Sequence, residues 1–204
     1  MPKTETISLF KSPFSGTYWK KALSEPKNLR ILVVVSLLSA LHIVVGSLFF
    51  TVGENLKVLF TFIPASLTAF IGGPVLALFS GFICDILGFL VHPSGPYFPG
   101  YTLSSMLGSL IYALFLYRSR ISVLRLFFAK LCVNLFVNVG FGSLWSAMIM
   151  GKAYYYYFAK SIVKNSILLP LETVILIAVF QLMLPVMAQN GLAPKQPSKR
   201  IPFL

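Results

Sequence analysis

Six long apolar runs follow one another along this chain and constrain its fold more than any other feature. Their approximate bounds are 30–50, 56–71, 74–91, 101–117, 123–150 and 159–187. A helix of about 20 residues crosses the roughly 30 Å of hydrocarbon in a bilayer. Hydrophobic residues make up 57% of the 204 residues and charged residues only 11%, which excludes an ordinary soluble domain. The runs therefore predict an all-α membrane protein with six transmembrane helices in one bundle.

The distribution of basic residues predicts how this bundle is oriented, because lysine and arginine gather in the cytoplasmic loops of membrane proteins. With both termini cytoplasmic, twelve of the 17 Lys and Arg residues fall on that side, four fall outside, and Lys130 lies within a span. We expect a multi-pass protein of the plasma membrane, with cytoplasmic tails at 1–28 and 189–204 and a transmembrane domain at 29–188. The outward connections are then 51–56, 92–100 and 151–158.

Composition and motifs argue against several other classes of protein. The net charge of +12 would suit nucleic-acid binding, but the hydropathy leaves no soluble domain to carry a basic patch. Cys84 and Cys132 lie within apolar runs without metal-ligand spacing, which predicts buried free thiols. The sequence holds no phosphate-binding glycine-rich loop and no zinc-protease or serine-hydrolase motif, so any ATP use belongs to another protein. We expect no cofactor, no metal and no nucleic-acid partner.

Aromatic and basic residues stand together near the N-terminus, where Tyr18 and Trp19 precede Lys20 and Lys21. This combination suits a segment that lies on an anionic membrane surface, and a disordered cytosolic tail is the alternative. The segment has no apolar core of the signal-peptide type, so we expect no cleaved leader.

Residues 92–100 read His-Pro-Ser-Gly-Pro-Tyr-Phe-Pro-Gly and predict a stiff, bent loop rather than a helix. Proline removes a backbone donor and fixes φ, whereas glycine permits positive φ. Tyr97 and Phe98 stand at the tip of this loop, beyond the acidic Asp85 of the preceding run. Two interpretations are open: a connection in the headgroup layer with aromatic anchors, or a lid over a binding site.

Three ionisable residues, Asp85, Lys130 and Glu172, lie deep within the apolar runs. A charge at mid-bilayer costs at least about 2.5 kcal/mol, so each residue needs a partner or a polar cavity. An ion pair that locks the bundle and a role in ligand binding are both open. Asp85 and Glu172 also have the chemistry of an acid and base in an intramembrane enzyme, but no nucleophile or metal set accompanies them. We expect no enzyme.

Polar residues with helical spacing surround these charges. Asp85 shares one face with small residues, which either allow close helix contact or leave space for a flat ligand. On the fifth run, asparagine amides follow Lys130 along one stripe. They can pair with the edge of a heterocycle while Trp145 or Phe141 stacks on its face, or they can hydrogen-bond a neighbouring helix. The two faces comprise Gly81, Asp85, Gly88 and His92, and Lys130, Asn134, Asn138 and Trp145.

The outer ends of the last two runs add basic and aromatic residues. Lys152 and Lys160 flank four consecutive tyrosines at 154–157, as expected for an aromatic belt with snorkelling lysines. Lys164, followed by Asn165, lies deeper in the run and is the better candidate for contact with an anion.

These residues resemble the membrane-embedded S components of energy-coupling factor transporters, and within them the folate-specific type. The similarity runs over nearly the whole chain after residue 28. It rests on LKVLFTFIP at 56–64, on 81–88 around Asp85, on PSGPYFPGYTLS at 93–104, and on Lys164-Asn165. The resemblance implies a six-helix bundle that captures a vitamin from outside. It also implies docking on a transmembrane coupling protein with two cytosolic ATPases, which hydrolyse the ATP.

The resemblance further implies which residues contact substrate and partner. Ser36 and Ala40 are expected to face the coupling protein, where the family pattern is Ala-x-x-x-Ala. Folate-type relatives often carry an arginine near the outer end of the first run, whereas this chain reads Gly-Ser-Leu-Phe-Phe at 46–50. Outward aromatics and lysines suit folate, a flat pterin joined to a glutamate with two carboxylates; thiamin or pantothenate is the alternative. The expected substrate contacts are Lys57, Thr61, Asp85, His92, Gly95, Pro96, Tyr97, Phe98, Thr102, Asn138, Trp145, Lys152, Lys164 and Asn165.

Overall fold

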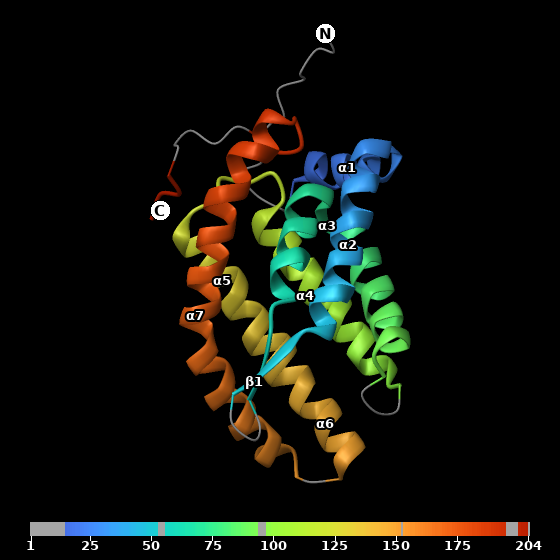
Figure 1. Ribbon diagram of the computed structural model, residues 1–204, viewed down its shortest axis with the longest axis vertical. Helices are drawn as coiled ribbons and strands as arrows, with labels where there is room; N and C mark the ends of the chain where they lie inside the picture. The colour runs from blue at the N-terminus through green and yellow to red at the C-terminus, as the bar shows by residue number, and fades with distance from the viewer. Residues whose placement is uncertain (1–14, 53–55, 94–96, 152, 195–199, 204) are drawn as a thin grey trace.

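The computed structural model describes residues 15–52, 56–93, 97–151, 153–194 and 200–203. Helices dominate it and form one elongated bundle (Figure 1). Over the described residues, five helical stretches are long and apolar enough to cross a membrane, in agreement with the predicted helical membrane protein. The elements are α1 (Gly16–Ser24), η1 (Glu25–Lys27), α2 (Leu29–Ser47), β1 (Phe49–Val52), β2 (Leu56–Leu59), α3 (Phe62–Val91), α4 (Pro99–Leu116), α5 (Val123–Cys132), η2 (Val133–Phe141), α6 (Gly142–Met150) and α7 (Tyr154–Gln189).

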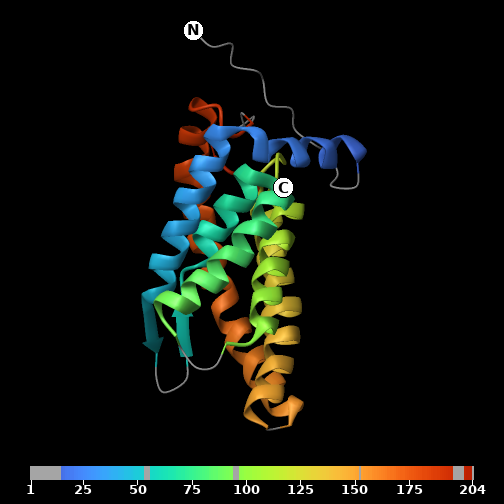
Figure 2. The same cartoon turned by 90° about the vertical axis from the view of Figure 1, so that its right-hand side faces the viewer.

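Helix α3 reverses its direction at a glycine. Gly73 has φ 72° and ψ −176°, outside the helical region, and Pro74 follows it. A side chain at Gly73 would meet the Tyr117 ring at 2.9 Å, so glycine suits both the backbone angle and the space. Figures 1 and 2 show the ribbon rising to the end of the bundle that carries α1 and then returning. The break falls between the predicted runs at 56–71 and 74–91, and the count of six complete crossings stays a prediction.

After α2 the chain forms a short antiparallel hairpin before it enters α3. In this hairpin Phe49 lies opposite Leu59 and Val52 lies opposite Leu56. The prediction that an apolar helix begins at residue 56 is wrong, because the helix begins at Phe62. β-Branched and aromatic residues favour extended pairing, and the ladder satisfies backbone groups that have left the helices.

The connection before α4 is shorter than the sequence predicts. Pro99 and Gly100 form the first turn of α4, with Phe98 as the residue that precedes the helix. Proline is tolerated there because an N–H in the first turn has no intrahelical partner to lose. The prediction of a non-helical loop over all of 92–100 is therefore wrong for its last two residues.

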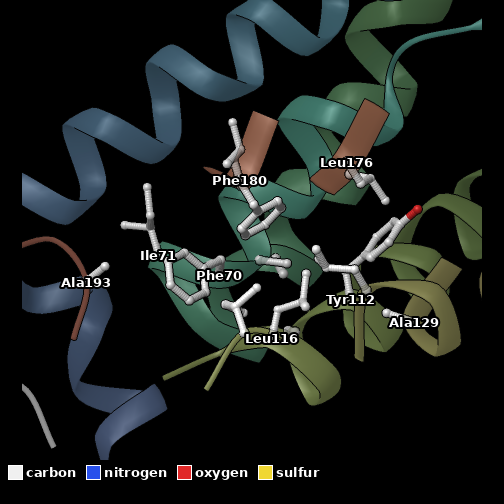
Figure 3. Close-up of a cluster of buried hydrophobic side chains, with 14 of the residues drawn as sticks. Phe70, Ile71, Tyr112, Leu116, Ala129, Leu176, Phe180 and Ala193 are labelled. Carbon is white, nitrogen blue, oxygen red and sulfur yellow. The ribbon is translucent and has the colours of Figure 1, made fainter. Parts of the chain in front are cut away.

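The core joins α3, α4 and α7 towards the end of the bundle that carries α1. The rings of Phe70 and Phe180 meet edge to face, with centroids 5.6 Å apart, and Leu116 and Leu176 are fully buried beside them. Figure 3 shows these side chains together with Tyr112, whose hydroxyl points away from the cluster. Close packing in this region fixes the three helices relative to one another, so polar residues further along them converge on a common space.

Helix α1 and η1 lie across one end of the bundle (Figure 2). The Tyr18 hydroxyl donates to the Ala113 carbonyl at 3.0 Å, and burial raises the pKa of this phenol. The carboxylate of Glu25, only 3% exposed, accepts from Arg118 and from the Tyr117 hydroxyl, both at 2.7 Å. Part of the segment predicted as an N-terminal tail is thus a short helix fastened to the bundle.

The described C-terminal residues return to the same end. The N–H groups of Val123 and Leu124 donate to the carbonyls of Pro202 and Phe203 at 3.0 and 3.2 Å. They cap the first turn of α5, where backbone N–H groups have no helical partner. Both described ends of the chain therefore lie at the α1 end of the bundle (Figure 1), as the predicted topology requires. Which side of the membrane this end faces stays a prediction.

Candidate functional site

A cavity of about 590 Å³ opens between α4, α7 and the helical stretch 123–150. Along α7 its wall runs from Tyr157 to Glu172, which corresponds to about 22 Å of helix. Short polar side chains of α4 and α6, the end of β2, His42 of α2 and the first turn of α3 also line it. Its length and mixed lining suit an elongated ligand with several polar groups.

An ion pair closes the inner end of this cavity. Lys130 Nζ lies 3.0 Å from Glu172 Oε2, and the two residues are 3% and 7% exposed. The ammonium group also stands 4.4 Å from the centroid of the Phe62 ring. Of the deep ionisable residues, Lys130 and Glu172 thus pair with each other, and Asp85 has a different partner.

Amide side chains continue from this ion pair along the wall. Asn134 donates to Glu172 at 3.3 Å, and Asn138 donates to Asn134 at 2.9 Å and to Asn165 at 3.3 Å. The predicted hydrogen bonds between helices are therefore present. Asn138 and Asn165 also line the cavity. The NH2 group of Asn138 is used in these two bonds and that of Asn165 donates to the carbonyl and hydroxyl of Ser161, so their side-chain oxygens keep the remaining hydrogen-bonding capacity.

Asn134 and Asn138 lie on a stretch of π-helix, η2, between α5 and α6, whereas Asn165 lies on α7. Such wide turns are rare and occur often at functional sites. Here the wide turn carries Asn134 and Asn138 towards α7. A helical wheel at ordinary spacing does not predict this change, and the sequence analysis missed it.

Two buried hydroxyls on the cavity wall have no hydrogen-bond partner among the described residues. They belong to Tyr112 and Ser143, which are 3% and 2% exposed. Leaving a buried polar group unpaired costs about 1–3 kcal/mol. A ligand or water in the cavity would relieve this cost. Tyr112 lies on α4 and Ser143 on α6, and the sequence analysis selected neither residue.

Lysines line the part of the cavity furthest from the ion pair, which is called its outer part below. Lys160 and Lys164 lie about one turn apart on α7, and Tyr157 stands one turn before them. Glu172 is the acidic residue that lines this cavity over the described part of the chain, and it is already paired with Lys130. The outer part is therefore suited to an anionic group.

A second cavity of about 480 Å³ adjoins the first and shares His42, Leu59, Thr61, Tyr101 and Ser105 with it. Its other lining residues include predicted site residues of α3 and of the connection to α4. These residues are Asp85, His92, Tyr97 and Phe98.

A chain of three side chains ties this connection to α3. The Tyr97 hydroxyl lies 2.7 Å from Thr102 Oγ1, which donates to Asp85 Oδ2 at 2.6 Å. Because the threonine hydroxyl gives its proton to the carboxylate, it accepts from the tyrosine. The Tyr97 ring also packs on Phe89, with centroids 5.4 Å apart. Asp85 thus orients the residue at the mouth of the second cavity.

Trp145 fastens the start of α4 to α6. Its ring lies 5.4 Å from that of Phe98 and stacks on Phe141 at 5.8 Å, and its indole N–H donates to Ser104 Oγ at 2.9 Å. A side chain at Gly100 would meet this indole at 2.7 Å, so glycine allows the close approach. The geometry gives Trp145 a packing role beside the cavities.

The predicted substrate contacts fall into three groups. Thr61, Asp85, His92, Tyr97, Phe98, Asn138, Lys164 and Asn165 line one or both cavities. Thr102 and Trp145 hold lining residues in place. Gly95, Pro96 and Lys152 lie outside the described residues, and Lys57 is described only as part of the β2 backbone. Lining residues that the sequence analysis did not select are His42, Tyr112, Ser143 and Lys160.

Asp85 and Glu172 do not form an acid–base pair. Asp85 lines the second cavity and accepts from Thr102, whereas Glu172 lines the first and pairs with Lys130. The predicted docking residues lie elsewhere, on α2. Ser36 and Ala40 are exposed there, on a helix of which few residues are buried. That surface is available to lipid or to another protein.

Comparison with known proteins identifies the architecture. The family model described as "ECF transporter, substrate-specific component" matches residues 30–184. "Folate transporter FolT" of Clostridium novyi (strain NT) is 30% identical over 150 residues, covering 74% of this chain and 87% of the relative. The protein of the same name from Leuconostoc mesenteroides is 32% identical over 150 residues, covering 70% and 80%.

A solved structure agrees with this result. "Crystal structure of FolT bound with folic acid" aligns with a TM-score of 0.66 and 28% sequence identity, covering 73% of this chain and 91% of that chain. The matched relatives are transporter subunits rather than enzymes, and the apolar helices fit a multi-pass membrane protein. The chain belongs to the family of substrate-specific components of energy-coupling factor transporters.

Proposed function

We propose that this chain binds folate from outside the cell and delivers it to an energy-coupling factor importer in the plasma membrane. The observation that carries the proposal is the polarity of the larger cavity. Two lysines and two amide side chains line its outer part, and the ion pair of Lys130 with Glu172 leaves its inner end without net charge. Folate has the same division, with an uncharged heterocycle at one end and a glutamate at the other. The names of the matched transporters and the folic acid in the similar structure support this choice.

The geometry favours a pose with the pterin inward and the glutamate outward. The side-chain oxygens of Asn138 and Asn165 offer acceptors to the pterin, and the unpaired hydroxyls of Tyr112 and Ser143 offer further partners. Lys160 and Lys164 stand where the tail would lie. In this pose Asp85 acts mainly through Thr102 and Tyr97, at the mouth of the adjoining cavity.

Transport requires partners, because the sequence has no nucleotide-binding motif of its own. In our proposal the exposed face of α2 with Ser36 and Ala40 docks on a transmembrane coupling protein, and two cytosolic ATPases supply the energy. Small residues support this assignment because they let a partner helix approach closely.

The test is the absorbance spectrum of the chain purified in detergent, followed by titration of the ligand-free chain. Copurified folate adds a near-ultraviolet band that protein lacks. Quenching of Trp145, which lies beside the cavities, then reports binding of added folate. Saturable binding of thiamin or pantothenate without binding of folate would overturn the substrate assignment and leave the family assignment intact.

A further inference from the structure

Helix α1 carries a surface that substrate capture and docking through α2 do not explain. The helix lies across the end of the bundle (Figure 2). Large apolar and basic side chains are exposed on it. Trp19 is 40% exposed and Leu23 62% exposed, and Lys20 and Lys21 are exposed beside them. We propose that α1 is a binding surface for the headgroups of anionic lipids.

The helical spacing divides α1 into three faces. Tyr18, Ala22 and the following Glu25 are buried against the bundle. At about 100° per residue, Trp19 and Leu23 point about 120° away from this face. This arrangement is typical of a helix that packs on the bundle with one face and on acyl chains with a second face. The third face, which points away from both, is then directed towards water.

The lysines occupy that opposite side. At the same spacing, Lys20 and Lys21 stand about 40–60° to either side of the direction opposite the two apolar faces. Lysines at these positions reach the headgroup layer while the apolar side chains enter the acyl boundary, as in interfacial amphipathic helices.

The charge of this end of the molecule selects an anionic surface. Lys27 and Arg30 are exposed close to α1, in addition to Lys20 and Lys21. Among the described side chains of α1 and η1, the one carboxylate is Glu25, which is buried and paired with Arg118. Exposed positive charge without exposed negative charge favours anionic lipid over zwitterionic lipid.

Rigid attachment keeps the surface in position. The bond from Tyr18 to Ala113 and the contacts of Glu25 with Tyr117 and Arg118 are all buried. The helix therefore loses little further conformational freedom when lipid binds, unlike a free amphipathic segment that must fold on the membrane.

The sequence offers a direct probe because its tryptophans number two, Trp19 and Trp145. A Trp145→Phe variant, with its helicity checked by circular dichroism, leaves Trp19 as the single reporter. The variant is placed in lipid nanodiscs that contain equal mole fractions of phosphatidylglycerol and phosphatidylcholine, and one lipid at a time is replaced by its brominated form. Bromine quenches only a tryptophan that it touches.

We expect brominated phosphatidylglycerol to quench Trp19 more strongly than brominated phosphatidylcholine. Near an anionic membrane surface each lysine strengthens binding to the lipid about fivefold, equivalent to about 1 kcal/mol. Lys20→Gln with Lys21→Gln should therefore sharply reduce the preference, and raising the salt concentration should weaken it. The matched control is Lys160→Gln, which removes a lysine at the opposite end and should keep the preference.

Equal quenching of Trp19 by the two brominated lipids would overturn the proposal. So would the absence of quenching by either lipid, because water or protein would then cover the helix. A preference that the double Lys20 and Lys21 substitution leaves undiminished would also overturn it, because the lysines of α1 would not be its source.

Discussion

The buried pair of Lys130 and Glu172 makes the sharpest prediction about stability. We consider the single changes Lys130→Met and Glu172→Gln, which keep side-chain length, and the variant that combines them. Each single change leaves one ionised group at the inner end of the cavity without its partner at 3.0 Å. Breaking a buried pair in this way costs about 3–5 kcal/mol.

For a chain of this size, 1 kcal/mol shifts the melting temperature by about 2–4 °C. Each single variant should therefore melt roughly 10 °C below the unmodified chain in detergent, as followed by circular dichroism without ligand. The double variant has no uncompensated charge, and its loss should be well below the sum of the two single losses.

The same cycle provides the refutation. If the losses of the two single variants add in the double variant, the charges do not depend on each other and the pair does not lock α5 to α7. Asn134, which donates to Glu172, would then be the main link between these helices. A control cycle of Lys160→Gln with Glu172→Gln should be additive in either case, because twelve residues of α7, about 18 Å of helix, separate the two positions.

Three further predictions concern function. Lys164→Gln should lower the affinity for folate by about tenfold but the affinity for pteroate, which lacks the glutamate, by less than about twofold. Equal losses of affinity in calorimetry would refute the assignment of Lys164 to the glutamate tail. Tyr97→Phe removes the bond to Thr102 and should raise the folate off-rate by about fivefold in stopped-flow measurements, with the exposed Tyr155→Phe as control; an unchanged rate would remove the lid role. Ala40→Trp should lower uptake into vesicles containing the complete transporter while folate affinity stays within about twofold, and a parallel loss of affinity would place α2 in the binding site.

Hydropathy predicted the helical bundle well because membrane spans need long apolar runs whatever their neighbours are. The run at 123–150 coincides with a continuous helical stretch, and Gly73 breaks α3 where the Gly-Gly-Pro sequence predicts a turn. The start of the second run was misplaced, because β2 is as apolar as a membrane helix. Hydropathy does not distinguish a helix from a paired strand of that composition.

The site was predicted in part, and the limits have a physical origin. Lys164 and Asn165 stood out because polar groups are rare and costly in apolar runs. The pairing of Lys130 with Glu172 rather than Asp85 depends on how three helices pack, which the spacing along one helix does not contain. Ser143 is significant only because its surroundings leave it without a partner.

The shortness of the first half of α3 has a consequence for how the empty protein responds to its ligand. Residues 62–72 rise only about 16 Å, roughly half the hydrocarbon thickness, and extended chain covers the rest of the distance. An extended strand is thinner than a helix, so the bundle lacks packing volume at the level of Leu59 and Thr61, which line both cavities.

A bound ligand would supply the contacts that a full-length helix would otherwise make. Occupancy should then raise the melting temperature in proportion to the logarithm of ligand concentration above the dissociation constant. A mutation that lengthened this helix to fill the space would stabilise the empty chain and compete with the ligand. In this bundle, the space that accepts a ligand is therefore the same space that leaves the empty protein incompletely packed.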